Sequence, residues 1–368
     1  MTFFLCACFL PAFVISFVIT ATVRKLAPRW GLIDQPNLER KVHKTPTPLG
    51  GGIGIWCGVV ATLLSAQAVL MWAAQAAVRP EWIPGALDLQ ATLQRSKQLW
   101  AIVGAGTILG VMGLIDDKRN LPWAPRLVIQ LAVAIGVVLA GVRASVFVPL
   151  PWIGSVITVG WILVLVNSLN FLDNMDGLSP GIGLVASLML ASVLLTATSE
   201  PRLLVGGVML VLAGSIAGFL CFNWPPASIF MGDSGSYFIG MMLACFTITG
   251  TFYDSSESRH VILTPLCILA VPLYDFCSVM IIRLKEGRSP FHADKSHFSH
   301  RLVELGLKPR NAVLTIHLAT MTTGLGALLL YQVEGWAGAT IVVALILCVL
   351  AIIAILETVG RRSAGSES

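Results

Sequence analysis

Apolar stretches of about 20 residues without charged side chains recur along the whole sequence. A helix of that length crosses the ~30 Å hydrocarbon core of a lipid bilayer. Charged residues make up 12% of the 368 residues, whereas about 25% is usual in a soluble domain. We therefore predict an all-α fold, a polytopic membrane helix bundle, and we exclude a water-soluble enzyme.

Eleven segments are predicted to be transmembrane helices, and together they leave no room for a soluble domain. Residues 1–360 are therefore expected to form a single integral-membrane domain, and the small polar residues 361–368 a disordered cytoplasmic tail. The first segment is followed by basic residues, so we expect a retained anchor and not a cleaved signal peptide. The predicted spans are 2–23, 49–74, 98–115, 126–142, 152–169, 178–196, 203–222, 235–252, 261–283, 311–331 and 336–357.

The basic residues give the orientation of the bundle. Alternate crossings divide the loops into two sets, and one set with the C-terminal tail holds 18 of the 24 Lys and Arg residues. Cytoplasmic loops of membrane proteins carry such an excess. Residues 24–48 and 283–310 contribute most of it, and we predict that this face is cytoplasmic. The net charge of +5 is thereby explained by topology and anionic lipid, and nucleic acid is set aside as a partner.

The eight cysteines lie in apolar runs without CxxC spacing, so neither a disulfide framework nor a zinc site is indicated. Adjacent carboxylates are more informative. Asp116 and Asp117 end the third span, and Lys118 follows them. Mg²⁺ favours oxygen ligands and takes one or two carboxylates together with substrate phosphates. A solvated helix end is the alternative explanation for such a pair.

A second polar group follows the fifth predicted span. On a continuous helix, Asn167, Asn170 and Asn174 fall within an ~80° stripe and Asp173 lies beside it. Asp176 would point to the other side, so we expect the helix to end near Gly177. Amide and carboxylate groups match the hydrogen-bonding edges of a nucleobase or ribose, although asparagines also join helices within membranes.

Two further groups complete the candidate set. Gly232-Asp233-Ser234-Gly235 precedes the eighth span, where glycines permit close approach of a ligand and a helix start favours phosphate. In the ninth span Asp275 is a carboxylate that needs a partner, a cation or a proton.

The longest cytoplasmic loop is predicted to contain a helix over 295–306. His297, His300 and Arg301 would share one face of it, and Phe298, Leu302 and Leu305 the other. We expect this helix to lie on the membrane surface with its cationic edge available to phosphate oxygens, or merely adsorbed to lipid.

All these groups lie on one side of the membrane, whereas a transporter would place polar residues at mid-membrane or on both sides. The pattern indicates a site where an anionic soluble substrate meets a lipid. An ion transporter that uses Asp173, Asp176 and Asp275 remains a remote alternative.

In order along the chain, these motifs resemble those of the bacterial polyprenyl-phosphate N-acetylhexosamine-1-phosphate transferases. The resemblance covers nearly the whole chain, from Pro48-Leu-Gly-Gly-Gly52 to His297–Arg301. It is greatest for the branch that uses N-acetylglucosamine. It implies a phosphotransferase of the inner membrane, active at the cytoplasmic face, in cell-envelope polysaccharide synthesis such as that of lipopolysaccharide or teichoic acid. UDP-N-acetylglucosamine and undecaprenyl phosphate would be its substrates, with Mg²⁺ or Mn²⁺ as cofactor. Membrane lipids surround it, and a homodimer is left open.

The resemblance also implies roles for individual residues. Asp117 and Asp233 would be the metal carboxylates, and Asp116 would lie beside the lipid phosphate or join the metal. The nucleotide would lie near Asp173 and Asp176, and the diphosphate or sugar near His297, His300 and Arg301. The resemblance adds Asn167, Asn170, Lys118 and Asp275 as substrate-binding candidates.

Two positions depart from the family pattern, which often has His at position 299 and Gly at position 174. Here Ser299 and Asn174 occupy them. The muramoyl-pentapeptide branch of the family, which typically carries consecutive histidines in this loop, and a relative that uses another UDP-N-acetylhexosamine are the alternatives. A lipid phosphate has a second pKa near 6 and is mostly dianionic at pH 7. We therefore expect direct attack without a strong base, and a phosphorylated aspartate is the second possibility.

Overall fold

The computed structural model describes residues 1–36, 46–76, 78, 80–144, 150–198, 200–250, 258–289 and 296–365, and side chains up to residue 357 in the last helix. The helices of the N-terminal half are α1 Thr2–Trp30, α2 Gly51–Gln75, α3 Leu89–Gln94, α4 Ser96–Arg119, α5 Trp123–Leu139 and α6 Pro151–Phe171. The strands β1 Ile33–Asp34 and β2 Thr47–Pro48 pair antiparallel, with Ile33 opposite Pro48.

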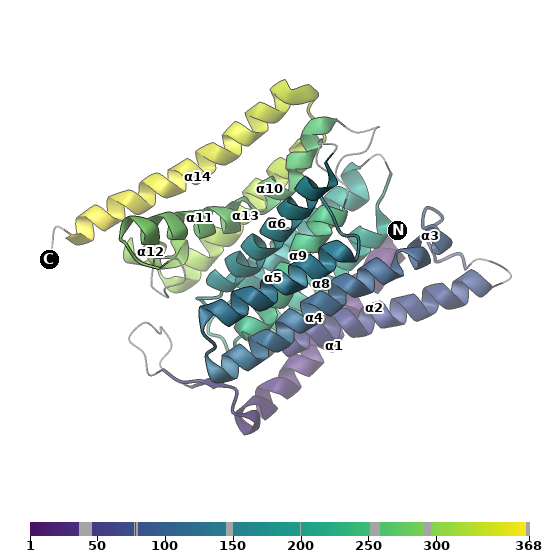
Figure 1. Cartoon of the computed structure of the whole chain (residues 1–368), viewed down its shortest axis with the longest axis horizontal. Coiled ribbons are helices and arrows are strands. Elements are labelled where there is room, and N and C mark those ends of the chain that lie inside the picture. The colour runs from purple at the N-terminus through teal and green to yellow at the C-terminus, as the bar shows by residue number, and fades with distance from the viewer. Residues whose placement is uncertain are drawn as a thin grey trace.

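The second half is also helical. It comprises α7 Leu178–Ser192, continued by the π-helical turn Val193–Ala197, and then α8 Leu203–Asn223 and α9 Gly232–Thr249. The 3₁₀ turn Arg259–Leu263 leads into α10 Thr264–Ile268, α11 Ala270–Lys285, α12 Phe298–Glu304, α13 Pro309–Leu329 and α14 Gly335–Gly365. Figure 1 shows the long helices running side by side as one bundle. The predicted polytopic helix bundle is thereby confirmed.

Each of the eleven predicted spans coincides with a helix or a pair of helices. Among the described residues, eight helices are long and apolar enough to cross a membrane. A ninth span results if residues 259–268 and α11, which meet at 66°, are counted as one. The remaining two predicted spans are shorter or more polar, since α5 has 17 residues and the first turn of α9 contains Asp233 and Ser234. Helix α14 extends to Gly365, into the range predicted as a disordered tail.

The bend before α11 has a local cause. Proline has no backbone N–H, and its ring clashes with the carbonyl of the residue four positions earlier. Pro272 is therefore incompatible with a continuous helix through Ile268, and the break falls at Leu269 between α10 and α11. The Ser168 hydroxyl on α6 donates to the Pro272 carbonyl at 2.6 Å, which ties the bent segment to the bundle.

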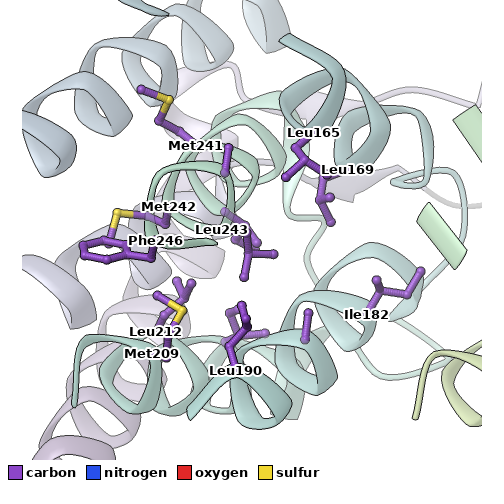
Figure 2. Packing of buried hydrophobic residues seen from close by; sticks show 14 of the residues in the cluster. Leu165, Leu169, Ile182, Leu190, Met209, Leu212, Met241, Met242, Leu243 and Phe246 are labelled. Carbon is purple, nitrogen blue, oxygen red and sulfur yellow. The ribbon is translucent and has the colours of Figure 1, made fainter. Parts of the chain in front are cut away.

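Helix α9 occupies the centre of the bundle. Nearly every side chain from Gly232 to Thr247 is buried, and Figure 2 shows its residues Met241, Leu243 and Phe246 among side chains of α6, α7 and α8. Because neighbouring helices surround α9 and keep it from lipid, it needs less apolar surface than a helix at the edge. The segment directly before α9 is held in place by backbone bonds, since Gly51 N–H donates to the Phe230 carbonyl and Gly52 N–H donates to the Met231 carbonyl.

Glycines allow α4 and α9 to approach closely. A Cβ atom added at Gly113 of α4 would lie 2.4 Å from the Asp233 carbonyl carbon, far below van der Waals contact. Membrane helices pack through such small residues. The close approach brings the end of α4, with its two aspartates, against the first turn of α9.

We expect Gly113→Ala to lower the melting temperature of the detergent-purified protein. The added methyl would push the helices apart, and overpacking costs about 1–3 kcal/mol. Gly104→Ala on the same helix is the matched control, because a Cβ there meets nothing within 4 Å. Equal melting temperatures for the two variants, measured by differential scanning fluorimetry, would contradict this packing.

Candidate active site

Asp117 and Asp233 meet where the end of α4 touches the start of α9. The Asp233 backbone N–H donates to Asp117 Oδ1 at 2.9 Å. The first turn of a helix has unpaired N–H groups and partial positive charge, which stabilise a carboxylate. The other oxygen of Asp117, Oδ2, is buried and has no hydrogen-bond partner. The structure thus brings together the two residues expected to hold a metal, and leaves one of their oxygens available.

Gly232 is required at this junction for two reasons. Its φ of +74° lies in the left-handed region that favours glycine. A Cβ atom on it would also lie 2.4 Å from Asp117 Oδ2. Any side chain at position 232 would therefore displace the carboxylate.

Asp116 faces a different partner. Its side chain is buried, Oδ1 accepts from the Leu121 N–H at 2.6 Å, and Oδ2 accepts from Arg126 Nη1 at 2.7 Å. The guanidinium, near the start of α5, is also 3.6 Å from Asp233 Oδ2. Asp116 therefore holds Arg126 beside Asp233. Arg126 was not among the predicted site residues, although a cationic side chain at the start of an otherwise apolar helix is a signal of a functional residue.

The asparagines of α6 have separate roles. Asn170 Nδ2 donates to Asp233 Oδ1 at 2.7 Å and to Ser236 Oγ at 3.1 Å, so it orients the Asp233 carboxylate. Asn167 Nδ2 instead donates to Gln130 Oε1 on α5 at 2.7 Å. Asn167 thus joins two helices, which is the alternative that its residue type suggested.

The helix that carries these asparagines is shorter than predicted. It ends at Phe171 and not near Gly177, since residues 172–177 form turns. Asn and Asp side chains compete with the helix for backbone groups, and here Asn174 Nδ2 donates to the Phe171 carbonyl at 2.8 Å. The predicted polar stripe is therefore wrong beyond Phe171, and Asn174 lies in a loop.

Asp173 and Asp176 lie in this 172–177 loop. The Asp173 carboxylate accepts from the Gly232 N–H and lies near Asp117 and Asp176. Burial, and then repulsion by these two carboxylates, raises the pKa of Asp173. Asp176 Oδ2 accepts from the Ala227 N–H at 2.9 Å, which connects the loop to the segment before α9.

An unpaired carboxylate oxygen makes this site suitable for a divalent cation. Asp117 Oδ2 is an unsatisfied buried oxygen, and Mg²⁺ takes one or two carboxylates with the rest of its shell from water and phosphate. Within the described part of the chain, the Arg126 guanidinium pairs with Asp116 and Asp233, and its one positive charge does not balance the four carboxylates Asp116, Asp117, Asp173 and Asp233. Among the described residues, however, no three His, Cys, Asp or Glu side chains form a ready-made metal cluster. The residues that could hold the ion are Asp117 and Asp233.

A second polar cluster surrounds Asp275 on α11. Asp275 is fully buried, Oδ1 accepts from the Phe298 N–H at 2.6 Å, and Oδ2 lies 2.9 Å from His297 Nδ1. Arg283 Nη2 is 3.4 Å from His297 Nε2. Asp275 was expected to need a partner, and that partner is His297. Through its bond to the Phe298 N–H, Asp275 also fixes the start of α12.

Arg301 is buried as well, 5% exposed. Its Nη1 is 2.7 Å from Glu357 Oε2 on α14, and its Nη2 donates to Ser278 Oγ at 2.8 Å. Glu357 also accepts from the Tyr274 hydroxyl at 3.0 Å. Glu357 was not among the predicted site residues, although a single carboxylate at the end of a long apolar segment indicates that a partner is needed.

These contacts correct one expectation about α12. We predicted a surface helix over 295–306 with a cationic edge available to substrate, but the helix covers Phe298–Glu304 and both His297 and Arg301 are buried. Buried carboxylates on α11 and α14 draw the two side chains inward. His300 is half-buried and Lys118 exposed. Residue Lys295 lies outside the described residues.

Comparison with known proteins identifies the family of the chain. The family model described as glycosyl transferase family 4 matches residues 99–251. A probable undecaprenyl-phosphate N-acetylglucosaminyl 1-phosphate transferase of Bacillus subtilis is 32% identical over 348 residues, which are 91% of this chain and 88% of the relative. The chain belongs to glycosyl transferase family 4.

Two other relatives support the same assignment. A decaprenyl-phosphate N-acetylglucosaminephosphotransferase of Mycobacterium tuberculosis is 33% identical over 343 residues, 86% of this chain and 80% of the relative. An undecaprenyl-phosphate alpha-N-acetylglucosaminyl 1-phosphate transferase of Escherichia coli K12 is 27% identical over 326 residues, which are 84% of this chain and 79% of the relative. The family resemblance inferred from the motifs is therefore confirmed, and this chain is a multi-pass membrane transferase of family 4.

We expect Asp116→Asn and Arg126→Gln each to lower transferase activity at least about 100-fold, since each breaks the pair that holds a cation beside Asp233. The double variant should be little worse than the worse single variant, because both substitutions remove the same interaction. Exposed Arg119→Gln is the control. Activity of Asp116→Asn should stay low between pH 7 and pH 9, whereas recovery at pH 9 would indicate that Asp116 is a base.

Proposed function

We propose that this protein transfers N-acetylglucosamine 1-phosphate from UDP-N-acetylglucosamine to undecaprenyl phosphate, giving undecaprenyl-diphospho-N-acetylglucosamine and UMP. One observation carries the proposal. Carboxylates from α4, the 172–177 loop and α9 meet beside the Arg126 guanidinium, at helix ends where a soluble nucleotide and a lipid headgroup can both arrive. The names of the relatives supply the substrate class.

The reaction exchanges one phosphoanhydride bond for another. An oxygen of the lipid phosphate attacks the phosphorus attached to the sugar, and the bond from that phosphorus to the bridging oxygen of UMP breaks. The attacking phosphate is already mostly dianionic at pH 7, so no proton has to be removed. The main obstacle is repulsion between two anions, which fixed positive charge reduces.

Arg126 is the group that we assign to the acceptor phosphate. Its guanidinium is partly exposed, and its Nη1 is held at 2.7 Å from Asp116 Oδ2. A fixed guanidinium binds phosphate oxygens without having to order itself first. Asp116 then acts by orienting Arg126, and a phosphorylated Asp116 is disfavoured because both of its oxygens accept hydrogen bonds.

The donor side is assigned to the remaining polar groups. A divalent cation, Mg²⁺ or Mn²⁺, held by Asp117 and Asp233 would neutralise the diphosphate of the nucleotide sugar. Asn170 keeps Asp233 in position at 2.7 Å. Asp173 and Asp176 lie where we place the nucleotide, and His300 lies on the side of the diphosphate or sugar. His297 and Arg301, which pair with Asp275 and Glu357, are assigned to the same side of the site.

The cellular setting follows from the same proposal. The loops and tail predicted for the face of the site contain 18 of the 24 Lys and Arg residues, which supports a cytoplasmic active site in a bacterial inner membrane. The product would serve as the first membrane intermediate of a cell-envelope polysaccharide.

We expect Asp117→Asn and Asp233→Asn to abolish UMP release while the protein still inserts and purifies. Each removes a charge that acts on the transition state, so losses above about 100-fold are expected. Glu200→Gln, an exposed carboxylate far from both in the sequence, is the control. Near-normal turnover of both aspartate variants at ordinary Mg²⁺ concentrations would refute the metal assignment.

The choice of sugar is tested by offering purified protein each nucleotide sugar separately with undecaprenyl phosphate and Mg²⁺. UDP-N-acetylglucosamine should release UMP and UDP-N-acetylmuramoyl-pentapeptide should not. Preference for the pentapeptide would refute the sugar assignment alone, and turnover of neither would indicate another UDP-N-acetylhexosamine. UMP release that does not depend on undecaprenyl phosphate would refute the transferase proposal.

A further inference from the structure

A hydrogen bond joins the two parts of the site that are far apart in the sequence. Ser299 Oγ on α12 donates to Asn174 Oδ1 in the 172–177 loop at 2.6 Å, across 125 positions. Ser299 is fully buried and Asn174 is half-buried. The Asn174 amide also donates to the Phe171 carbonyl. The side chain of Asn174 therefore links the end of α6 to α12.

The residues beside this bond are the ones assigned to the nucleotide sugar. Asp173 precedes Asn174, and Asp176 follows it by two positions. His300 follows Ser299 directly. A shift of the bonded pair would change the distance between the carboxylates of the loop and the imidazole of His300.

The two bonded side chains are also in direct contact, so their sizes depend on each other. A larger side chain at position 299, such as an imidazole, would need the space that the Asn174 side chain occupies. Removal of the Asn174 side chain would free that space and remove the acceptor of the Ser299 hydroxyl.

The backbone does not require glycine at position 174. Among the described residues, Asn120 is the one non-glycine residue with positive φ, so Asn174 is in an ordinary conformation. The identity of residue 174 is therefore decided by its side-chain contact and not by backbone strain.

We propose that Asn174 and Ser299 are a coupled pair of positioning residues that fixes the 172–177 loop against α12, and that a change of size at one position requires a compensating change at the other. The proposal rests on the function assigned above, because the loop and α12 are the parts placed around the nucleotide sugar. Neither residue is assigned a contact with the reacting atoms.

A double-mutant cycle tests the coupling. Asn174→Gly and Ser299→His should each lower kcat/KM for UDP-N-acetylglucosamine at least about 10-fold, through a lost buried hydrogen bond or a clash. In the double variant Asn174→Gly with Ser299→His, kcat/KM should return to within about 3-fold of the wild-type value, because the effects of substitutions at residues in contact are not additive. Losses that multiply in the double variant would overturn the proposal.

Two further measurements separate positioning from general damage. Ser299→Ala removes the hydroxyl without adding volume, and in the Asn174→Gly background it should cause no further loss. The KM for UDP-N-acetylglucosamine should rise in the single variants while the KM for undecaprenyl phosphate stays unchanged, since Arg126 lies on a different element. Ser187→Ala is the control, because this buried serine bonds only to Gly183 within its own helix. Equal increases in both KM values would overturn the proposal.

Thermal unfolding gives a readout that does not need activity. Melting temperatures should be measured for the wild type, Asn174→Gly, Ser299→His and the double variant. The double variant should melt at a higher temperature than the sum of the two single shifts predicts. Absence of UMP release from the wild type would refute the proposed function and leave the melting cycle to decide the pairing. Additive shifts in that cycle would overturn the coupling.

Discussion

The cost of placing a charged group near hydrocarbon determines how this active site is built. A carboxylate at the bilayer centre is expensive, yet the site gathers several of them. They lie at the ends of helices or in the loop between α6 and α7, and the described contacts give each a partner: Arg126 for Asp116, the start of α9 for Asp117, and Asn170 for Asp233. Within this group of carboxylates, Asp117 Oδ2 has no hydrogen-bond partner, and this oxygen is where a ligand can bind.

Close helix packing makes this arrangement possible. The start of α9 reaches the end of α4 only because Gly113 and Gly232 have no side chains, and a Cβ at either would lie 2.4 Å from the other segment. The neighbouring Gly52 on α2 packs against the Gly235 backbone in the same way. Small residues thus determine the spacing of the carboxylates, although they take no part in the chemistry. Figure 1 shows α2, α4 and α9 as neighbours in the bundle.

Sequence reasoning recovered the parts of the molecule that depend on local composition. Runs of apolar residues located the membrane helices, and the order of the acidic motifs identified the family. It failed where a long-range contact decides the outcome. The residues of the 172–177 loop were expected on a helix, because the periodicity of asparagines does not reveal that Asn174 bonds the Phe171 carbonyl. His297 and Arg301 were expected at the surface, because the sequence around them does not show that His297 pairs with Asp275 and Arg301 with Glu357.

The partner of Arg301 lies on α14, far from α12 in the sequence. Glu357 is 3% exposed and bonds both Arg301 and Tyr274, so α12 acquires its complete set of contacts only when α14 is in place. During synthesis α14 leaves the ribosome after α4, α9 and α12. A chain made only as far as α12 therefore carries the carboxylates of α4 and α9 but lacks the anchor for its histidine segment. The fold thus ties assembly of the histidine side of the site to the insertion of α14.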